Sequence, residues 1–245
     1  MKVCVIPARG GSKRIPRKNI RAFCGQPVIG YAIAAARHSK LFDHVVVSTE
    51  DEEIAQVARE LGAQVPFMRP AALADDHTTT RPVLVHALEW FEQAYPDDSV
   101  SGLCCIYPVT PFLNATLLQE ADQAWREAKA DYCMSVGAFP ASPYRALKAT
   151  EAGRVTSIWP QYRAKRTQDL PEAFYDAGMF YFCDPKALKA RTPIHSQATV
   201  PFVLSRSVAH DIDTLEDWSL AELIYQAHQT HQAHQAHRVT GGSDG

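Results

Sequence analysis

Short apolar segments alternate with amphipathic segments along the first 138 residues of the chain. Such short apolar runs are typical of strands that are buried on both faces, and those at 1–7 and 44–49 are rich in β-branched residues. We expect such strands at residues 1–7, 44–49, 64–68, 102–107 and 132–138. The segments between them carry apolar residues at helical spacing and predict helices at 27–39, 50–61, 79–95 and 114–129. This alternation predicts an α/β fold with a doubly wound, mostly parallel sheet, a Rossmann-like variant.

The regular alternation ends after residue 138. Residues 139–172 contain four prolines with interleaved Tyr, Trp and Arg, which predicts an excursion from the sheet with a hairpin around Gly153. Further strands are expected at 174–183, 199–204 and 207–212, and then a helix at 214–228. Thr214 and Asp217 can cap that helix, and Asn114 can cap the helix at 114–129. We therefore expect one domain over residues 1–228, in which 139–172 is a lid or dimerisation excursion.

The His- and Gln-rich tail at 229–245 contains a degenerate AHQ repeat and then a Gly-rich end. This composition predicts a frayed helix extension followed by disorder, and we assign it no function.

The composition narrows the class of protein. The chain has 245 residues, of which 46% are hydrophobic and 21% charged, as in ordinary globular proteins. Its net charge of −2 argues against a general nucleic-acid binder. It contains no apolar run long enough to span a membrane and no secretory signal, so we expect no membrane partner and a cytoplasmic location. The six cysteines form no C-x-x-C pair, and those in predicted strands are expected to be small buried groups.

The segment ARGGSKRIPRKN at residues 8–19 directly follows the first predicted strand. Gly10 and Gly11 allow a sharp turn that brings backbone N–H groups close to an anion, and Ser12 adds a hydroxyl. Six cations and no acid follow from residue 9 to residue 21, namely Arg9, Lys13, Arg14, Arg17, Lys18 and Arg21. This composition predicts a polyphosphate site, although a solvated loop remains an alternative. Neither a Walker A motif nor G-x-G-x-x-G is present, which disfavours a hydride-transferring dehydrogenase.

A pair of carboxylates, Asp211 and Asp213, falls at the end of the last predicted strand. Residues i and i+2 of a strand point to one face, so the two carboxylates should converge while Ile212 points into the core. Oxygen ligands of this kind favour Mg²⁺. The alternative is a helix N-cap preceded by a solvated Asp.

Two more polar loops are candidates for ligand binding. Residues 69–80 follow the third predicted strand, where Arg69 and several hydroxyls could contact a base and a ribose. Residues 165–171 offer Arg166 to a carboxylate, although a charged lid edge would look the same.

Six segments together resemble the CMP-sugar synthetases, the acylneuraminate cytidylyltransferase family. They are PARGGSKRIPRKNI at 7–20, VVVSTEDEEIAQVARELGA at 45–63, RPAALADDHT at 69–78, IYPVTPFL at 106–113, TQDLPEAFYDAG at 167–178 and DIDTLEDW at 211–218. Within the family, these motifs are more similar to the pseudaminic acid branch than to the sialic acid branch. Tyr107, for example, stands where sialic acid enzymes usually carry Gln.

The resemblance implies a nucleotidyltransferase that transfers CMP from CTP to a nonulosonic acid, a nine-carbon 2-keto acid sugar, with Mg²⁺ as cofactor. It implies that Arg9, Ser12 and Lys18 bind the CTP phosphates together with the Gly10–Gly11 backbone. Ala8 and Asn19 would lie near the base and ribose, and Arg69, Thr78 and Thr80 would recognise cytidine. Asp211 and Asp213 would bind the metal. Arg9, Lys18 and Asp213 are therefore the expected catalytic residues.

For the acceptor, the resemblance implies a carboxylate clamp by Arg166 and a pocket shaped by Tyr107, Gln168 and Asp176. Family members are homodimers, in which the segment after the fifth strand reaches toward the partner's active site.

Several alternatives remain open from the sequence. The acceptor could be legionaminic acid, sialic acid or the eight-carbon acid Kdo. The chain could also be a sugar-1-phosphate nucleotidylyltransferase, or a non-catalytic nucleotide-binding regulator that kept the loop.

Overall fold

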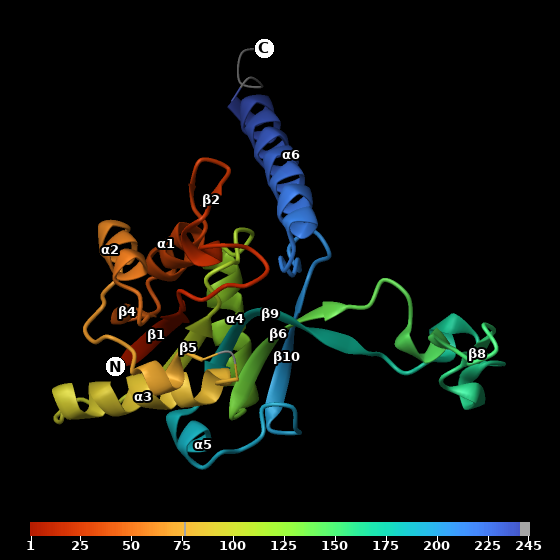
Figure 1. Cartoon of the computed structure of the whole chain (residues 1–245), viewed down its shortest axis with the longest axis horizontal. Helices are drawn as coiled ribbons and strands as arrows, with labels where there is room; N and C mark the ends of the chain where they lie inside the picture. Colours follow the sequence, from red (N-terminus) through yellow and green to blue (C-terminus); the bar gives the residue numbers. More distant parts are fainter. Residues whose placement is uncertain (76, 241–245) are drawn as a thin grey trace.

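A six-stranded sheet forms the centre of the computed structural model, which describes residues 1–75 and 77–240 (Figure 1). Its strands are β1 (Lys2–Pro7), β4 (His44–Ser48), β5 (Gly102–Ile106), β6 (Tyr132–Ala138), β9 (Phe174–Cys183) and β10 (Thr199–Leu204). They lie in the order β10-β6-β9-β5-β1-β4. Only β9 is antiparallel to its neighbours β5 and β6, and the other pairs are parallel. The predicted mostly parallel α/β sheet is thus confirmed.

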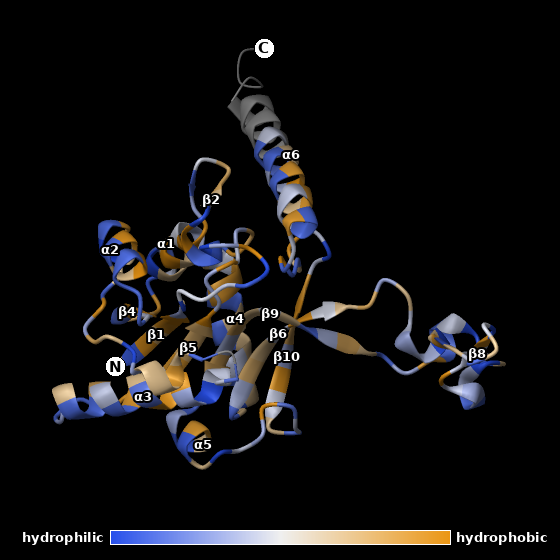
Figure 2. Cartoon of the chain, in the orientation of Figure 1, coloured by the Kyte–Doolittle hydropathy of each residue, from blue (hydrophilic) through white to orange (hydrophobic). Residues whose placement is uncertain are grey.

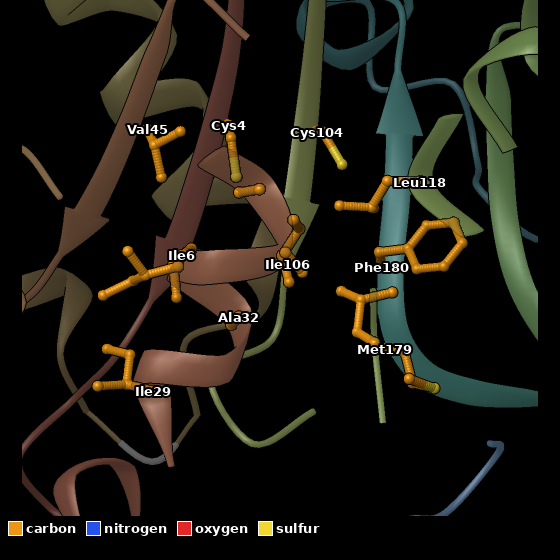
Figure 3. Packing of buried hydrophobic residues seen from close by; sticks show 14 of the residues in the cluster. Cys4, Ile6, Ile29, Ala32, Val45, Cys104, Ile106, Leu118, Met179 and Phe180 are labelled. Carbon is orange, nitrogen blue, oxygen red and sulfur yellow. The ribbon is translucent and has the colours of Figure 1, made fainter. Parts of the chain in front are cut away.

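Helices cover both faces of this sheet (Figure 1). One face packs against α1 (Ile29–Ser39), α2 (Glu52–Glu60) and α4 (Ala115–Ala128), and the other against α3 (Thr80–Ala94) and α5 (Pro185–Lys189). On the first face Cys4 and Ile6 of β1 belong to one buried cluster with Ile29 of α1 and Leu118 of α4 (Figure 3). Hydrophobic residues dominate the central strands (Figure 2). Since burial of apolar area drives this packing, the strands form the expected two-sided core.

The cysteines occupy this core as the sequence predicts. Cys4, Cys104, Cys105 and Cys133 are fully buried in strands, and all six cysteines are free thiols. Burial raises the pKa of the Cys133 thiol to about 12. The thiols therefore act as small apolar groups.

A third apolar cluster joins the cationic loop to the last helix, α6 (Leu215–Thr240). Ile15 in the loop and Ile212 before α6 are both buried in it, next to Trp218. Phe23 joins them from the small hairpin of β2 (Ala22–Phe23) and β3 (Gln26–Pro27). As expected, Ile212 points into the core. The cluster fixes two segments almost 200 residues apart in sequence next to each other.

The strand expected at 64–68 is wrong. Gln64 forms only a single bridge to β4, with Val46 opposite, and no strand follows. Pro66 has no N–H group and cannot continue the ladder of hydrogen bonds.

The strand expected at 207–212 is also wrong. The N–H groups of Val208 and Ala209 donate to the carbonyl of Ser205, which closes a turn. The N–H groups of Asp213 and Thr214 donate to the Asp217 carboxylate at 3.1 and 2.7 Å, forming the expected cap of α6. These backbone donors are therefore satisfied locally, and the DIDT segment is a loop.

Residues 139–172 leave the sheet and carry a small hairpin of β7 (Leu147–Ala149) and β8 (Val155–Ser157) far from the central strands (Figure 1). The hairpin turns at Gly153, as predicted, with a φ of 70°. Helix α5 was not expected, because five residues carry too little periodicity to be recognised.

Helix α6 continues through 229–240, which the sequence analysis placed in a tail expected to end in disorder. Ala and Gln favour helix and no Gly or Pro interrupts before Gly241, which explains the extension. The disorder expected in the tail at 229–245 is therefore wrong for residues 229–240, and residues 241–245 of that tail lie outside the described residues. Within the described part of the chain, no helix is both long and apolar enough to cross a membrane.

Candidate active site

A cavity of about 710 Å³ opens where β1 and β5 end. This edge of an open α/β sheet is where ligands commonly bind. Ten of the predicted site residues line it, namely Arg9, Ser12, Lys18, Asn19, Arg69, Thr78, Thr80, Tyr107, Asp211 and Asp213. The structure thus brings together segments that are separated by up to 204 positions in the sequence.

The cations of the loop at 8–21 are partly neutralised by carboxylates of the chain itself. Lys18 Nζ lies 3.1 Å from one oxygen of Asp213, and Arg14 lies 2.8 Å from the other. Arg21 lies over the Trp218 ring, 5.5 Å from its centroid. The expected mutual repulsion of the cations is therefore reduced by internal acids as well as by any bound anion.

Arg69 is almost fully buried in the wall of the cavity, with 6% of its surface exposed. Its guanidinium donates to the hydroxyl and the carbonyl oxygen of Ser48 at the end of β4. Burial lowers the pKa of Arg69, and the nearby Glu50 carboxylate opposes that shift. A buried cation held in this way is positioned to meet an anionic or carbonyl oxygen in the cavity.

The hydroxyls predicted to recognise a nucleoside lie at the start of α3. Thr78 Oγ1 donates to Asp75 at 2.7 Å, and Thr80 Oγ1 lies 2.5 Å from the Tyr107 hydroxyl. Burial raises the pKa of Tyr107 to about 12, so its hydroxyl stays protonated. This pair of hydroxyls separates the first cavity from a second one.

The second cavity, of about 1230 Å³, lies between the sheet and helices α3 and α5. It shares Thr80, Tyr107 and Tyr181 with the first cavity, so the two adjoin. Asp176 lines the second cavity only, and its carboxylate accepts a hydrogen bond from the Tyr181 hydroxyl at 2.5 Å. The predicted acceptor residues Tyr107 and Asp176 therefore meet at this second cavity.

Tyr181 was missed by the sequence analysis although it lines both cavities. Gly178, between Asp176 and Tyr181, has a φ of 60°, which only Gly adopts without strain. This bend within β9 lets Asp176 reach the Tyr181 hydroxyl. The isolated Gly in a strand was the available signal, because it often marks a bend.

Five predicted residues line neither cavity. Ala8 is fully buried and its N–H donates to the Ser48 carbonyl at 2.9 Å. The Gly10 N–H donates to Glu50 Oε1 at 2.7 Å, and Gly11 is exposed. Arg166 and Gln168 lie on the excursion, where Arg166 pairs with Asp169 at 3.1 Å. Within one chain, the structure does not bring these last two side chains to either cavity (Figure 1).

Asp211 and Asp213 both line the first cavity even though their segment is not a strand. The pKa of Asp211 is raised, mainly by burial and secondly by the negative charge of Asp213 nearby. This is expected for two neighbouring carboxylates that repel each other. Two carboxylate oxygens beside a phosphate-sized cationic site fit Mg²⁺. Among the described residues no group of three or more His, Cys, Asp or Glu could hold a metal, so waters and phosphates would complete its shell.

The doubly wound sheet and the cation-lined cavity at its edge define a nucleotide-binding enzyme of the α/β class. Residues 3–178 match the family model described as cytidylyltransferase, and the chain belongs to that family. It is therefore a nucleotidyltransferase.

Curated relatives cover most of the chain. A pseudaminic acid cytidylyltransferase of Campylobacter jejuni is 37% identical over 226 residues, covering 92% of this chain and 97% of its own length. A CMP-N,N'-diacetyllegionaminic acid synthase of Legionella pneumophila is 31% identical, covering 91% and 96%. A Helicobacter pylori protein that combines a pseudaminic acid cytidylyltransferase with a hydrolase is 34% identical over 86% of this chain and 40% of its own length.

Solved structures confirm the fold. A CMP-2-keto-3-deoxy-manno-octonic acid synthetase in complex with CTP superposes with a TM-score of 0.63 at 17% identity, covering 94% of this chain and 99% of that one. A 4-diphosphocytidyl-2C-methyl-D-erythritol synthase of Anaerococcus prevotii gives 0.61 at 13% identity, covering 92% and 98%.

Proposed function

We propose that the chain transfers CMP from CTP to pseudaminic acid and releases pyrophosphate. The observation that carries this proposal is the single cavity that gathers Arg9, Lys18 and Arg69 with the carboxylates of Asp211 and Asp213. Such a site combines anion binding with oxygen ligands for a divalent cation. The choice of acceptor is supported by the similarity to pseudaminic acid cytidylyltransferases over 92% of the chain.

In the proposed reaction, the anomeric hydroxyl oxygen of the sugar attacks the α-phosphorus of CTP in line with the leaving group. The bond from the α-phosphorus to the α–β bridging oxygen breaks, and its electrons leave with pyrophosphate. The hydroxyl proton passes to water in the open cavity. Lys18 and Arg9 neutralise charge that grows on the phosphate oxygens, and the Gly10–Ser12 segment lies beside them as part of the loop.

Asp211 and Asp213 would hold Mg²⁺, which supplies positive charge to the phosphate oxygens. Lys18 and Arg14, which face Asp213 at 3.1 and 2.8 Å, hold that carboxylate in its orientation. Arg69 and the hydroxyls of Thr78 and Thr80 would face the cytidine, with Asn19 and Ala8 on the loop side.

We place the acceptor in the second cavity, beyond the Thr80–Tyr107 pair. Most of its wall area is apolar, which suits a sugar with acylated amino groups and a deoxy carbon. Its polar groups are Asp176, the threonine and tyrosine hydroxyls, and further ionisable side chains on or next to α3 and α5, namely Arg81, His86, Glu89, Lys189, Arg191 and His195. The proposed reaction requires neither nucleic acid nor membrane, and the cytoplasmic location stays a prediction.

The first experiment measures pyrophosphate release with CTP and Mg²⁺ in parallel reactions containing pseudaminic, legionaminic, sialic and Kdo acids. We expect release with pseudaminic acid and at least about tenfold lower kcat/KM with the others, because one lost polar contact in a fitted site costs about 1.4 kcal/mol or more. Replacing CTP with UTP or ATP serves as the nucleotide control.

Release with sialic acid instead would keep the cytidylyltransferase reaction and overturn the acceptor. CTP binding without release from any sugar would favour the non-catalytic regulator.

We further propose a homodimer in which Arg166 and Gln168 serve the active site of the partner chain. The excursion exposes apolar side chains, with Leu147 at 60% and Val155 at 68% of their surface, and Trp159 at 41%. Exposed apolar groups gathered on one outlying hairpin are typical of a contact surface. In such a dimer, Arg166 of one chain would bind the carboxylate of the acceptor sugar in the active site of the other chain.

Mixing two inactive variants tests this arrangement. Arg166→Ala removes the carboxylate clamp, and Asp213→Asn removes a metal ligand. In a mixed dimer one site carries both changes and the other none, so equal mixing after refolding or co-expression should restore about a quarter of the unaltered activity. Sedimentation of each variant checks that dimers form, and mixtures no more active than either parent would contradict the shared site.

A further inference from the structure

Arg14 and Lys18 pair with Asp213 in the cavity, whereas Arg17 pairs with carboxylates that lie away from it. Its Nη1 and Nη2 contact the two oxygens of Asp51 at 2.5 and 2.9 Å, a bidentate pair, and Nη2 also contacts Glu53. Asp51 and Glu53 stand at the start of α2, whereas Arg17 is absent from the lining of the cavity. Although Arg17 belongs to the cationic loop by sequence, its charge is directed to α2.

The backbone at Arg17 adopts a conformation that the ion pair must hold. Its φ of 53° and ψ of 33° are left-handed, which non-Gly residues rarely adopt. Lys18 follows immediately, begins a short 3-10 helix (Lys18–Ile20), and faces Asp213 in the cavity. The left-handed residue therefore sends two consecutive cations to opposite sides of the loop.

The same acidic turn contacts the other end of the loop. The Gly10 N–H donates to Glu50 at 2.7 Å. A Cβ at position 10 would lie 2.5 Å from Asp51 Oδ2, so only Gly allows this approach. Asn19 then donates to the Arg9 carbonyl at 2.8 Å and ties the two ends of the loop to each other.

Asp51 is itself held rigidly. It caps α2 by accepting the Ile54 N–H at 3.0 Å, and its side chain is only 20% exposed. The hydrogen bond from Arg17 is the main reason that the pKa of Asp51 falls to about 2, so this carboxylate stays ionised in any ordinary assay buffer. A rigid helix end is thus available as an anchor for the loop.

We infer that the Glu50–Glu53 turn latches the phosphate loop, and that Arg17 is a positioning residue that sets Lys18 toward the CTP phosphates rather than a phosphate ligand. The inference rests on the proposed assignment of this loop to CTP. Of the two adjacent cations, Arg17 would then anchor the loop and Lys18 would bind the ligand.

The test is a double-mutant cycle read by calorimetric binding of CTP with Mg²⁺, which needs no acceptor sugar. Arg17→Leu removes the cation, and Asp51→Asn with Glu53→Gln removes both acids while an asparagine can still cap α2. We expect each change to weaken CTP binding by about tenfold, equivalent to about 1.4 kcal/mol, and the combination to be no weaker than either alone. Arg17→Lys, which keeps the charge without the bidentate geometry, should recover part of the loss.

A second cycle asks whether Arg17 acts through Lys18. In a Lys18→Ala background, Arg17→Leu should have less than about a twofold further effect on CTP binding, because the group it positions is gone. Arg59→Leu is the matched control, since it breaks an exposed ion pair of α2 with Glu52 at 2.9 Å and should leave CTP binding unchanged.

Two outcomes would overturn the latch while CTP still binds to the unaltered chain. Fully additive losses in the first cycle would mean that Arg17 contacts the phosphates itself. A lowered melting temperature with unchanged CTP binding would mean a merely structural ion pair. Failure of the unaltered chain to bind CTP would overturn the proposed function, and the latch with it.

Discussion

Asp213→Asn is expected to lower kcat by at least about 100-fold while leaving the fold intact. The change removes an anionic oxygen from the proposed Mg²⁺ site and leaves Lys18 and Arg14 without their shared partner, at 3.1 and 2.8 Å. Asp213 is part of a loop, and the cap of α6 depends on its backbone N–H, which the substitution keeps. Pyrophosphate release at several Mg²⁺ concentrations measures the effect, and the Mg²⁺ needed for half-maximal rate should rise.

The matched control is Glu216→Gln, which neutralises an exposed carboxylate three residues away that lines neither cavity. It should keep kcat within about twofold, as exposed single charges contribute little. A melting temperature of the Asp213 variant close to that of the control would show that the loss is not unfolding. Near-normal turnover of Asp213→Asn would reject the metal assignment.

Asp122→Ala is expected to destabilise the whole chain. Asp122 in α4 has no exposed surface, and its two oxygens pair with Lys2 at 2.5 Å and Arg126 at 2.7 Å. Removing the Asp122 carboxylate leaves the Lys2 charge unpaired in a mostly buried place. Breaking a buried pair in this way costs about 3–5 kcal/mol of unfolding free energy. We expect a loss of about 3 kcal/mol, because the second partner, Arg126, is largely exposed. For a domain of this size, that loss lowers the melting temperature by roughly 6–12 °C.

The control for Asp122 is Glu92→Ala, which breaks a similarly short pair with Lys189 at 2.5 Å on the surface. An exposed pair contributes about 0–1 kcal/mol, so its melting temperature should fall by no more than roughly 4 °C. If differential scanning calorimetry gives both variants the same melting temperature, the buried contacts of Asp122 with Lys2 and Arg126 do not stabilise the fold as we expect.

Hydrophobic periodicity predicted most of the sheet, because buried strands such as 44–49 and 102–107 are short apolar runs between amphipathic segments. It could not predict that β9 would run antiparallel between β5 and β6, since a strand's pattern reports its burial and not its neighbours. It also failed at 64–68 and 207–212, where Pro66 and the Asp217 cap take away the backbone partners that a strand needs.

Residue type predicted the composition of the site better than the direction of each side chain. The spacing argument for Asp211 and Asp213 assumed a strand, whereas both reach the cavity from a loop anchored by Ile212 in the third apolar cluster. Arg17 and Lys18 look alike in the sequence, and only the left-handed backbone at Arg17 separates their directions. Tyr181 depends on the bend at Gly178, which the strand pattern alone does not reveal.

The pairing of β6 with β9 has a consequence for how this fold can change over time. Ala138 and Phe174 face each other across the ladder, so the excursion leaves and re-enters the sheet at the same place. A short turn could close that gap, and a longer insert would cost little more, because the entropy of closing a loop grows only slowly with its length. The position is therefore a natural insertion point, where a lineage can exchange one accessory segment for another without rebuilding the nucleotide pocket.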